Sequence, residues 1–440
     1  MADVRPLRGI RFDPEVVQLG GVLAAPYDVI DDAERETLYG RDLRNIVRID
    51  YGQDTRDDVP GISDRYTRAA ELLSSWLAMG VLVGEPRVAF YVTEHRFVTP
   101  DGSDQVRRGL IARVRAAPWP ASDLRPHEHT LRGPKQDRLA LMRATATQTS
   151  PVFAVWQEAP TIAAILDQVA AAPATAGGGT AGEIGPEMHR LWVVDDATRV
   201  EAIHDAFVSA RLYIADGHHR YETAAAYAAE RAAEGDDAEA DSQFALVYLC
   251  DAADAGISLL PTHRLLLPRP GAAFSLDDLW MRLDDRWEVE RQDDLTDAAA
   301  VATAMRETRH AFAVRAPDGA AVLSRSRNGP ASPRAGLDVV VLQEEVLAPA
   351  GADEATIRDG ALAYTRSLEE VDRAVRDGEA VLGFGVNAAT PAEMIAVADA
   401  GEVMPQKSTY FYPKVPTGLV LSPLSAAGDA PHARPRTIPA

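Results

Sequence analysis

The sequence predicts a mixed α+β fold, and three patterns along the chain carry this prediction. Residues 87–99 and 106–115 alternate apolar and polar side chains on either side of a Pro-Asp-Gly turn, which predicts a β-hairpin. Residues 211–222 predict a short strand that runs into an alanine-rich helix. After a proline-rich linker that begins near residue 268, predicted helices alternate with strands, an order typical of α+β proteins.

Composition bounds the kinds of protein that this chain can be. It has 440 residues, 46% hydrophobic and 25% charged, which indicates a soluble globular protein of two or three packed units. The formal net charge of −21 opposes sequence-independent binding to nucleic acid, so no nucleic-acid partner is expected. No stretch approaches 18 uncharged apolar residues, and the N-terminal residues lack the apolar core of a signal peptide. We therefore expect a cytoplasmic protein without a membrane partner.

The first 118 residues predict an α/β unit. Residues 4–12 and 46–50 are expected to form strands, and residues 63–79 a helix that ends at Gly80. Asp28 follows a proline-set turn, and two interpretations stay open for it: it caps a helix that begins near residue 31, or it belongs to a functional site.

Residues 119–268 predict a second unit built around the strand and helix at 211–222. The glycine run at 177–179 lacks the lysine and Ser/Thr of a P-loop, so we interpret it as a flexible turn. The remaining predicted elements of this unit are helices at 137–144 and 202–210 and strands at 152–156, 190–195, 243–250 and 257–260. Cys250, the single cysteine, excludes an intrachain disulfide and is expected to be a buried thiol.

Residues 269–424 predict a third, α+β unit, and residues 425–440 a disordered tail. Residues 404–419 combine two lysines, hydroxyls and aromatic side chains between prolines. This stretch is either a rigid loop that closes over an anionic ligand or a proline-rich chain end that packs its aromatic rings on a sheet.

The chain is organised around the central turn, residues 216–220. A predicted strand ends at Asp216, Gly217 permits a left-handed backbone, and the helix is expected to begin at about His219. Such a turn presents free N–H groups and a positive helix end, which suit a phosphate, and Arg220 adds a fork of donors. Since His218, His219 and Arg220 cannot all face an apolar core in one turn, some must point outward. The alternative is a capped helix with a histidine ring packed on the sheet.

The distribution of lysine residues also indicates a functional site at the central turn. Only three of the 45 basic residues are lysine, namely Lys135, Lys407 and Lys414. A compact ammonium group meets a phosphate or carboxylate oxygen at closer range than a guanidinium group does. We therefore predict that the three lysines converge on the central turn around a shared anion.

Two further segments hold candidate residues. Glu128 lies between His127 and His129; adjacent residues of an extended chain point to opposite faces, which disfavours a zinc site there and favours Glu128 as a general base or near a magnesium ion. His263 and Arg264 follow a predicted strand, and they are either ordinary strand-end residues or part of the site.

Six ordered motifs together resemble the prokaryotic domain-of-unknown-function family numbered 1015, over nearly the whole chain. They are Pro-Tyr-Asp-Val-Ile at 26–30, Pro-His-Glu-His-Thr at 126–130, Pro-Lys-Gln-Asp-Arg-Leu at 134–139, Ala-Asp-Gly-His-His-Arg-Tyr-Glu-Thr at 215–223, Leu-Pro-Thr-His-Arg at 260–264 and Met-Pro-Gln-Lys-Ser-Thr at 404–409.

The motifs at 126–130 and 215–223 also resemble the ParB/sulfiredoxin fold and, within it, the free serine kinases. The resemblance implies a ParB/sulfiredoxin-like central unit, a nucleotide (ATP or ADP) and Mg²⁺ as cofactors, Glu128 as the base for the substrate hydroxyl, and phosphates and metal held at the central turn. Departures from the kinases are a longer spacing between Glu128 and Asp216 and large flanking units. Sulfiredoxins have a cysteine near the place of His218, so sulfinic acid reduction is not expected.

The sequence therefore predicts a nucleotide-dependent phosphotransferase that acts on a small hydroxylated metabolite, with free L-serine as the best guess. The alternatives are a nucleotide-binding switch or partitioning-type adaptor, and a phosphatase or nucleotidase. A homodimer is compatible with the sequence. The expected roles are catalytic for Glu128, Asp216 and His219, nucleotide-binding for Gly217, His218, Arg220, Lys135, Lys407, His263 and Arg264, and metal-ligating for Asp216.

Overall fold

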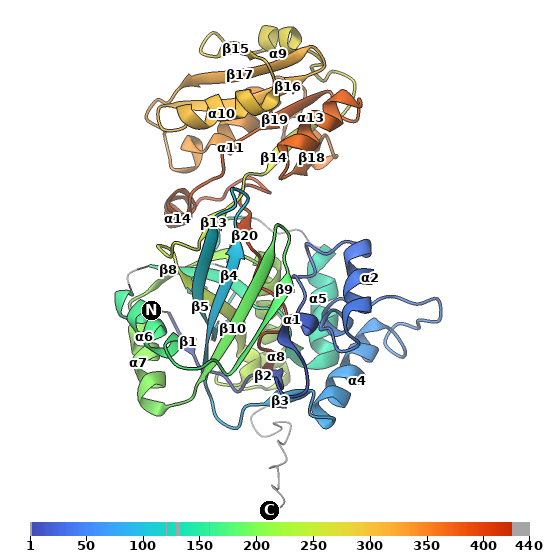
Figure 1. The fold of residues 1–440 in the computed structure, drawn as a ribbon, viewed down its shortest axis with the longest axis vertical. Helices are drawn as coiled ribbons and strands as arrows, with labels where there is room; N and C mark the ends of the chain where they lie inside the picture. The colour runs from blue at the N-terminus through green and yellow to red at the C-terminus, as the bar shows by residue number, and fades with distance from the viewer. Residues whose placement is uncertain (1, 120, 129–132, 158, 425–440) are drawn as a thin grey trace, which may run out of the picture. The chain divides into compact units, whose positions relative to one another are not determined.

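The computed structural model describes residues 2–119, 121–128, 133–157 and 159–424 (Figure 1). The described chain forms two compact units. Of the described residues, the first unit comprises 2–119, 121–126, 133–157, 159–258 and 413–424, and the second comprises 127–128 and 259–412. The predicted disordered tail at 425–440 lies outside the described residues, as does His129.

The first unit is built on a nine-stranded sheet in the order β6-β11-β8-β12-β5-β4-β10-β9, with β1 paired to β5. Most neighbours are antiparallel, while β12 with β8 and β11 with β6 are parallel. The strands are β1 (Val4–Arg5), β4 (Phe90–Val98), β5 (Asp104–Arg115), β6 (Leu124–Arg125), β8 (Val152–Gln157), β9 (Ala176–Ala181), β10 (Pro186–Val194), β11 (Arg211–Asp216) and β12 (Phe244–Asp251).

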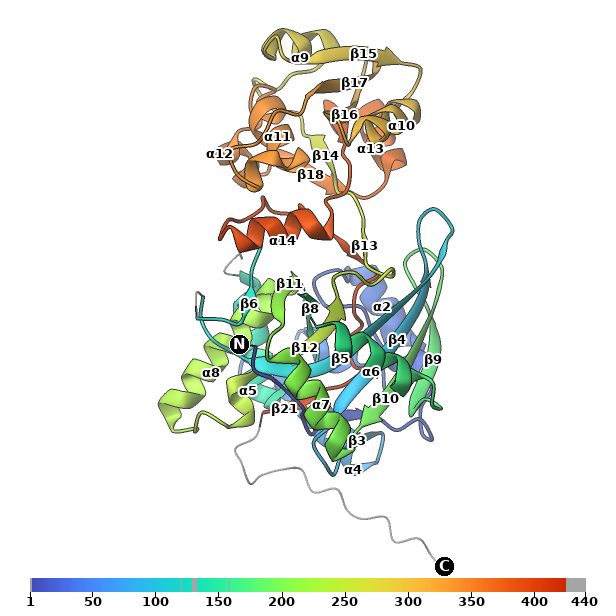
Figure 2. The ribbon, with the colours of Figure 1, turned by 90° about the vertical axis from the view of Figure 1, so that its left-hand side faces the viewer.

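One face of this sheet packs on three helices through the main core of the unit. Helices α6 (Pro160–Ala170), α7 (Ala197–Phe207) and α8 (His218–Glu234) contribute Ile162, Phe207, Tyr221 and others to it (Figure 2). The sheet contributes alternate residues such as Phe90, Val92, Leu110 and Trp156, because successive side chains of a strand point to opposite faces. The intervening residues, His95 among them, therefore lie on the other face.

Shorter elements complete the first unit. Strands β2 (Ile10–Phe12) and β3 (Leu82–Gly84) pair with each other, as do β7 (Thr147–Gln148) and β21 (Ser422–Pro423). The remaining helices are α1 (Leu19–Val22), α2 (Asp32–Arg41), α3 (Val47–Asp50), α4 (Arg65–Ala78) and α5 (Gly133–Thr145).

The second unit has an antiparallel six-stranded sheet in the order β15-β17-β16-β19-β14-β18. Adjacent residues such as Ala311 and Phe312 belong to different core clusters, so both faces of this sheet are covered. The strands are β14 (His263–Leu266), β15 (Glu288–Gln292), β16 (Arg309–Ala316), β17 (Gly319–Ser326), β18 (Leu362–Thr365) and β19 (Leu382–Gly385). The helices are α9 (Leu276–Arg282), α10 (Leu295–Met305), α11 (Asp338–Val341), α12 (Glu354–Arg358), α13 (Leu368–Arg376) and α14 (Pro391–Asp399), with a π-helix at Leu342–Leu347.

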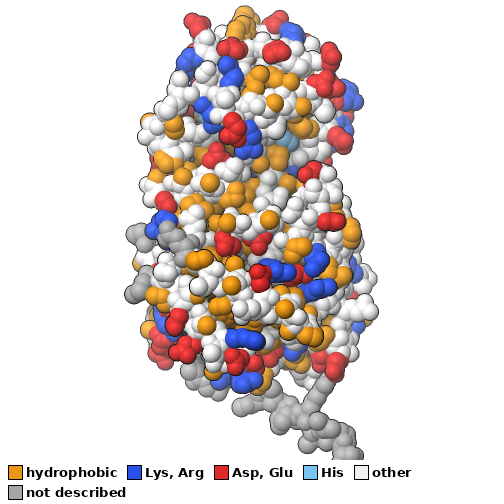
Figure 3. Space-filling model, turned by 60° about the vertical axis from the view of Figure 1, so that its left-hand side comes forward, with side chains coloured by type: hydrophobic (Ala, Val, Ile, Leu, Met, Phe, Trp, Pro, Cys, Tyr) orange, Lys and Arg blue, Asp and Glu red, His pale blue; other side chains and the backbone are white. Residues whose placement is uncertain are grey.

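Acidic and basic side chains lie among one another on the molecular surface, and some of them form ion pairs (Figure 3). Figure 3 shows acidic side chains among the basic ones on the face that it presents. The pair between Arg143 and Glu230 is an example, with 2.5 Å between Nη2 and Oε1. Among the described residues, no helix is both long and apolar enough to cross a membrane.

The mixed α and β class predicted from the sequence is confirmed, and so is the antiparallel hairpin of β4 and β5. Residues 46–50, predicted as a strand, instead contain the short helix α3. The reason is Asn45, whose side chain accepts from the N–H of Val47 at 3.0 Å and donates to the carbonyls of Gly21 and Leu23. Residues 4–12 form two strands, β1 and β2, rather than one.

The glycine run at 177–179 is also different from the predicted flexible turn, because it lies in the edge strand β9. Its glycines permit a close approach of α1. A Cβ atom on Gly178 would lie 2.8 Å from the backbone nitrogen of Gly20, and one on Gly20 would lie 1.7 Å from the carbonyl oxygen of Gly179. No larger side chain fits between these two backbones.

The chain also divides differently from the expected boundaries at 118/119 and 268/269. Strands β4 and β5 come from the predicted first unit, while β8, β11 and β12 come from the predicted second unit, yet all five belong to one sheet. Hydrogen bonding between β5 and β12 joins segments more than 100 residues apart, which local sequence patterns do not specify.

Candidate functional site

The central turn connects β11 to α8 as predicted. Gly217 has a φ angle of 88°, in the left-handed region, and the helix begins at His218. A Cβ atom at Gly217 would also lie 2.9 Å from the guanidinium group of Arg220, so both backbone geometry and space require glycine. The N-cap residue of α8 is Gly217, which has no side chain that could cap the helix. Its amide groups and the helix dipole therefore favour an anion at this end.

Asp216 is held between two cations. The Lys414 ammonium group donates to Oδ1 at 2.6 Å, and the Arg220 guanidinium group donates to Oδ2 at 2.6 Å. Burial by itself would raise the pKa of Asp216, but Lys414 and Arg220 hold it well below its ordinary range. Lys414 thus reaches the central turn, as predicted.

This arrangement does not fit the predicted magnesium ligand. Both carboxylate oxygens of Asp216 already accept from positively charged groups, whereas a Mg²⁺ ligand offers an oxygen lone pair to the metal. A divalent cation at this position would also face two neighbouring cations. The residues of the turn therefore fit an anionic ligand better than a metal ion.

Arg220 is buried, so it is not one of the residues of this turn that point outward. Its side chain is 6% exposed, and it donates to the hydroxyl of Ser150 at 3.1 Å and to the carbonyl of Pro151. Burial opposes the charge of Arg220, but Asp28 and Asp216 raise its pKa above the ordinary value. Since Asp216 and Arg220 are four residues apart across the turn, the ion pair draws the arginine inward.

The segment at 26–30 lies next to this cluster. Asp28 does not cap the following helix, because Asp31 accepts from the N–H of Glu34 at 2.8 Å instead. The charge of Asp28 is the largest single contribution that raises the pKa of Arg220, which favours the site interpretation of Asp28. Burial raises the pKa of Tyr27 to about 12, and its buried hydroxyl has no hydrogen-bond partner among the described residues.

A second buried ion pair, between Arg138 and Asp50, packs against the ring of Tyr27. The Arg138 guanidinium carbon lies 4.0 Å from the centre of the Tyr27 ring, and Arg138 donates to Asp50 at 3.2 Å. Asp50 also accepts from the hydroxyl of Thr149 at 2.6 Å. Asp50, Thr149 and Ser150 were not singled out from the sequence. The only signals for them are that Asp50 ends the largely apolar stretch at 46–49 and that Thr149 and Ser150 directly precede the apolar run at 151–156.

Lys135 reaches α8 but not the Asp216 carboxylate. Its ammonium group pairs with Glu222, which also accepts from the indole N–H of Trp119 at 2.9 Å. Glu222 lies six residues beyond Asp216 in the sequence. The predicted convergence therefore holds for Lys414, whereas Lys135 lies farther along the helix.

The second unit brings together two other motifs. Glu128 forms an isolated parallel β-bridge with Met404, and the N–H of Met404 donates to the carbonyl of His127 at 2.7 Å. The ring of His127 lies 3.0 Å from the hydroxyl of Thr409. The segments at 126–128 and 404–409 thus lie side by side.

His263 and Arg264 lie in β14, close to the same loop. Arg264 donates to the carbonyl of Lys407 at 3.2 Å, and burial lowers the pKa of Arg264 to about 10. Burial lowers the pKa of His263 to about 4, and its Nδ1 accepts from the N–H of Val386. Lys407 is exposed and has a φ angle of 58°, so Arg264 holds its backbone in a left-handed conformation. Because Lys407 belongs to the second unit, its convergence with Lys414 stays a prediction.

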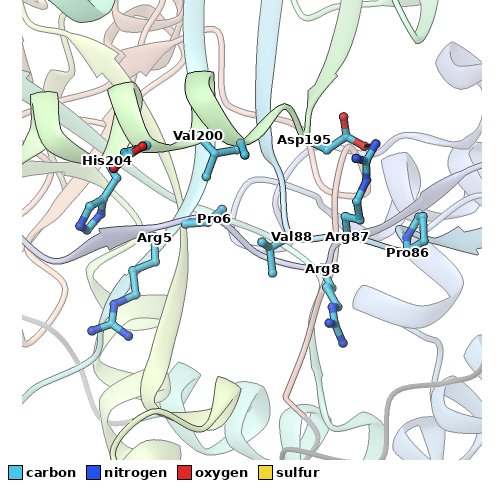
Figure 4. A pocket seen from close by; sticks show the side chains of 11 residues that line it. Arg5, Pro6, Arg8, Pro86, Arg87, Val88, Asp195, Val200 and His204 are labelled. Atoms are coloured by element: carbon cyan, nitrogen blue, oxygen red, sulfur yellow. Dashed lines mark hydrogen bonds and ion pairs between the residues drawn. The ribbon is translucent and has the colours of Figure 1, made fainter.

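A cavity of the first unit lies elsewhere. Its volume is about 640 Å³, and none of the predicted site residues lines it. Figure 4 shows Arg5, Arg8 and Arg87 around it, with Arg87 beside Asp195. The position of this cavity does not support a ligand site at the central turn.

These features define a mixed α and β protein whose central glycine turn favours an anion. The family model described as "Protein of unknown function (DUF1015)" matches residues 4–340, and the chain belongs to this family. The family resemblance is thereby confirmed over residues 4–340, which hold five of the six motifs, while the motif at 404–409 lies outside the match. No curated protein matches the chain.

Solved structures that resemble the chain include free serine kinases. A free serine kinase variant in complex with AMP has 14% sequence identity and a TM-score of 0.35, over 68% of this chain and 89% of the kinase chain. A conserved hypothetical protein from Pyrococcus furiosus has 15% identity and a TM-score of 0.34, over 67% and 90%. SbnI with a C-terminal truncation, from Staphylococcus aureus, has 12% identity and a TM-score of 0.33, over 69% and 84%. Similarities of this size carry no argument about activity.

Proposed function

We propose that this protein is a nucleotide-dependent phosphotransferase that acts on a small hydroxylated metabolite, with free L-serine as the best candidate. The observation that carries the proposal is the left-handed Gly217 turn, which opens helix α8 next to two cations, Arg220 and Lys414. Backbone amides, a helix dipole and fixed cations at one point are what a phosphate chain requires. The resemblance of the motifs to free serine kinases is a second, independent support.

In this proposal, the central turn holds the phosphates and orients the terminal phosphoryl group. The substrate hydroxyl attacks phosphorus, a new O–P bond forms, and the bond to the leaving nucleotide breaks. Glu128 accepts the hydroxyl proton, a role that rests on its motif. His219, half-buried in the first turn of α8, donates to the phosphates. Catalysis then comes mainly from positioning and charge neutralisation.

Asp216 acts in this proposal as a positioning residue. It fixes Arg220 and Lys414 at the turn through two ion pairs, and we assign it no magnesium and no step that involves one. When a phosphate binds, Lys414 is the cation that can turn toward it, since Arg220 is also anchored by Ser150 and Pro151.

The experiment that tests this function is a product assay. Purified protein is incubated with ATP or ADP and a panel of small hydroxy compounds that includes L-serine, and phosphorylated products are measured by mass spectrometry. The proposal expects phosphoserine from the wild type and about 10²–10⁴ times slower product formation from Glu128→Gln. Glu354→Gln, which changes an exposed acid in α12 that is 79% exposed, is the matched control and should leave turnover unchanged.

The same samples separate the alternatives. Nucleotide binding by calorimetry without any product, together with a nucleotide-dependent change of mass in solution, would favour a switch or adaptor. Release of inorganic phosphate without an acceptor would favour a phosphatase or nucleotidase. Absence of nucleotide binding would refute all three.

A further inference from the structure

A cluster of two histidines and one glutamate lies on the sheet face opposite the main core of the first unit. His95 in β4 and His189 in β10 are direct partners in the antiparallel ladder. Glu187 precedes His189 by two residues and therefore points to the same face of the sheet. The pairing of two strands thus places three metal-ligating side chains together.

The geometry of this cluster is compact. The distance from His95 Nε2 to Glu187 Oε2 is 2.8 Å, and the distance from His189 Nε2 to the same oxygen is 3.6 Å. One donor atom from each of the three residues lies within 4.8 Å of the others. The side chains are 5%, 10% and 2% exposed for His95, Glu187 and His189, so the cluster is largely excluded from solvent.

His189 supplies the second observation. Its Nε2 atom is buried, lies in this cluster, and has no hydrogen-bond partner among the described residues. A buried imidazole nitrogen without a partner costs free energy unless some group binds it. Glu187 Oε2 lies 3.6 Å away, beyond a normal hydrogen bond. None of the described side chains therefore supplies the partner that His189 Nε2 needs.

We propose that His95, Glu187 and His189 bind one divalent transition-metal ion, with Zn²⁺ as the best fit. Two imidazoles and one carboxylate form a donor set that suits zinc and related first-row metals, and that does not suit Ca²⁺ or Mg²⁺, which prefer oxygen ligands. Three protein ligands leave a fourth position open on a tetrahedral ion. A cavity of about 10 Å³ adjoins His95 and His189, which is the size of one water molecule.

Arg107, which also lines this cavity, is compatible with the ion. Its Nη2 lies 3.4 Å from His95 Nδ1 and only 2.9 Å from the carbonyl of Pro413, so the carbonyl is its main acceptor. With the metal on Nε2 of His95, Nδ1 carries the ring proton and Arg107 stays on Pro413. The Glu187 carboxylate and a hydroxide bound to the metal offset the two positive charges of the ion. The neighbouring Arg107 cation favours the hydroxide over a neutral water molecule.

The contact with Pro413 gives the ion a role in the fold. Pro413 immediately precedes Lys414, the residue that pairs with Asp216. Arg107 is the ladder partner of His95, so a metal that fixes His95 also restrains Arg107. Through its hydrogen bond to Pro413, Arg107 then stabilises the position of Lys414 at the central turn. This site is distinct from the nucleotide site proposed above and does not depend on it.

The test is metal binding by the full chain after it has been stripped with a chelator. Equilibrium dialysis against Zn²⁺ followed by elemental analysis should find one tightly bound ion per chain. Co²⁺ in its place should give the visible absorption bands of a low-coordinate site with nitrogen and oxygen ligands. Zn²⁺ should also raise the melting temperature of the stripped wild type.

Variants decide whether the ion is at this cluster. His189→Gln and the more conservative Glu187→Gln should each lose the bound ion, the Co²⁺ bands and the Zn²⁺-dependent rise in melting temperature. The control is His310→Gln, which changes a buried histidine that pairs with Asp338 in the second unit, and it should bind one ion as the wild type does. The proposal is overturned if the wild type binds no Zn²⁺, or if both cluster variants retain the ion.

Discussion

Replacing Lys414 by methionine should destabilise the first unit through Asp216. The two charged groups are 2.6 Å apart, and their side chains are only 11% and 19% exposed. Methionine keeps most of the length of the lysine side chain but leaves the Asp216 carboxylate with one cation instead of two. Breaking a buried ion pair from one side costs about 3–5 kcal/mol. Because Arg220 remains, we expect a loss near the lower end, about 3 kcal/mol of unfolding free energy.

The effect of Lys414→Met should also depend on pH in a defined direction. The folded pKa of Asp216 lies below its ordinary value of 3.8, so this group stabilises the folded protein at pH values above 3.8. That stabilisation is lost as the pH falls through the folded pKa, because the carboxyl is then protonated in both states. The difference between wild type and variant should be full at about pH 7 and should shrink at pH values below 3.8.

The assay is urea denaturation of both proteins across this pH range, with midpoints compared at similar slopes. Lys414→Arg, which keeps the positive charge, is the control and should lose less stability than Lys414→Met. Asp216→Asn completes a double-mutant cycle, in which the two changes should not be additive. Equal stability of wild type and Lys414→Met at about pH 7 would refute the claim that this ion pair supports the turn.

Three further predictions concern other positions. Arg220→Ala should lower the unfolding free energy by about 3–5 kcal/mol, because it removes one of the two cations that pair with Asp216 and also the hydrogen bonds to Ser150 and Pro151; an unchanged melting temperature would show that these contacts are dispensable. Gly178→Ala should lower the melting temperature more than an alanine at exposed Gly40 does, because a Cβ would lie 2.8 Å from the backbone nitrogen of Gly20; a stable variant would mean that α1 does not approach β9. Glu128→Gln should slow turnover by about 10²–10⁴ while nucleotide affinity measured by calorimetry stays within a few-fold, and normal turnover would remove Glu128 as the base.

The sequence alone determined the features that depend on neighbouring residues. The strand that ends at Asp216, the left-handed Gly217 and the helix behind it follow from local backbone preferences, and the structure has all three. The hairpin of β4 and β5 follows from alternation around a turn. The rarity of lysine in this chain predicted that the three lysines lie near an anion-binding turn, and Lys414 pairs with Asp216 at that turn.

Only the tertiary structure decided which side chains meet. Lys414 lies 198 residues beyond Asp216, and no local pattern specifies that contact. Arg220 is buried because Ser150 and Pro151, from another segment, accept its hydrogen bonds. The glycine run forms a strand because it pairs with β10, and His95 meets His189 because β4 pairs with β10 in one register. Each outcome depends on long-range packing, whose free energy outweighs the weak local preferences of a few residues.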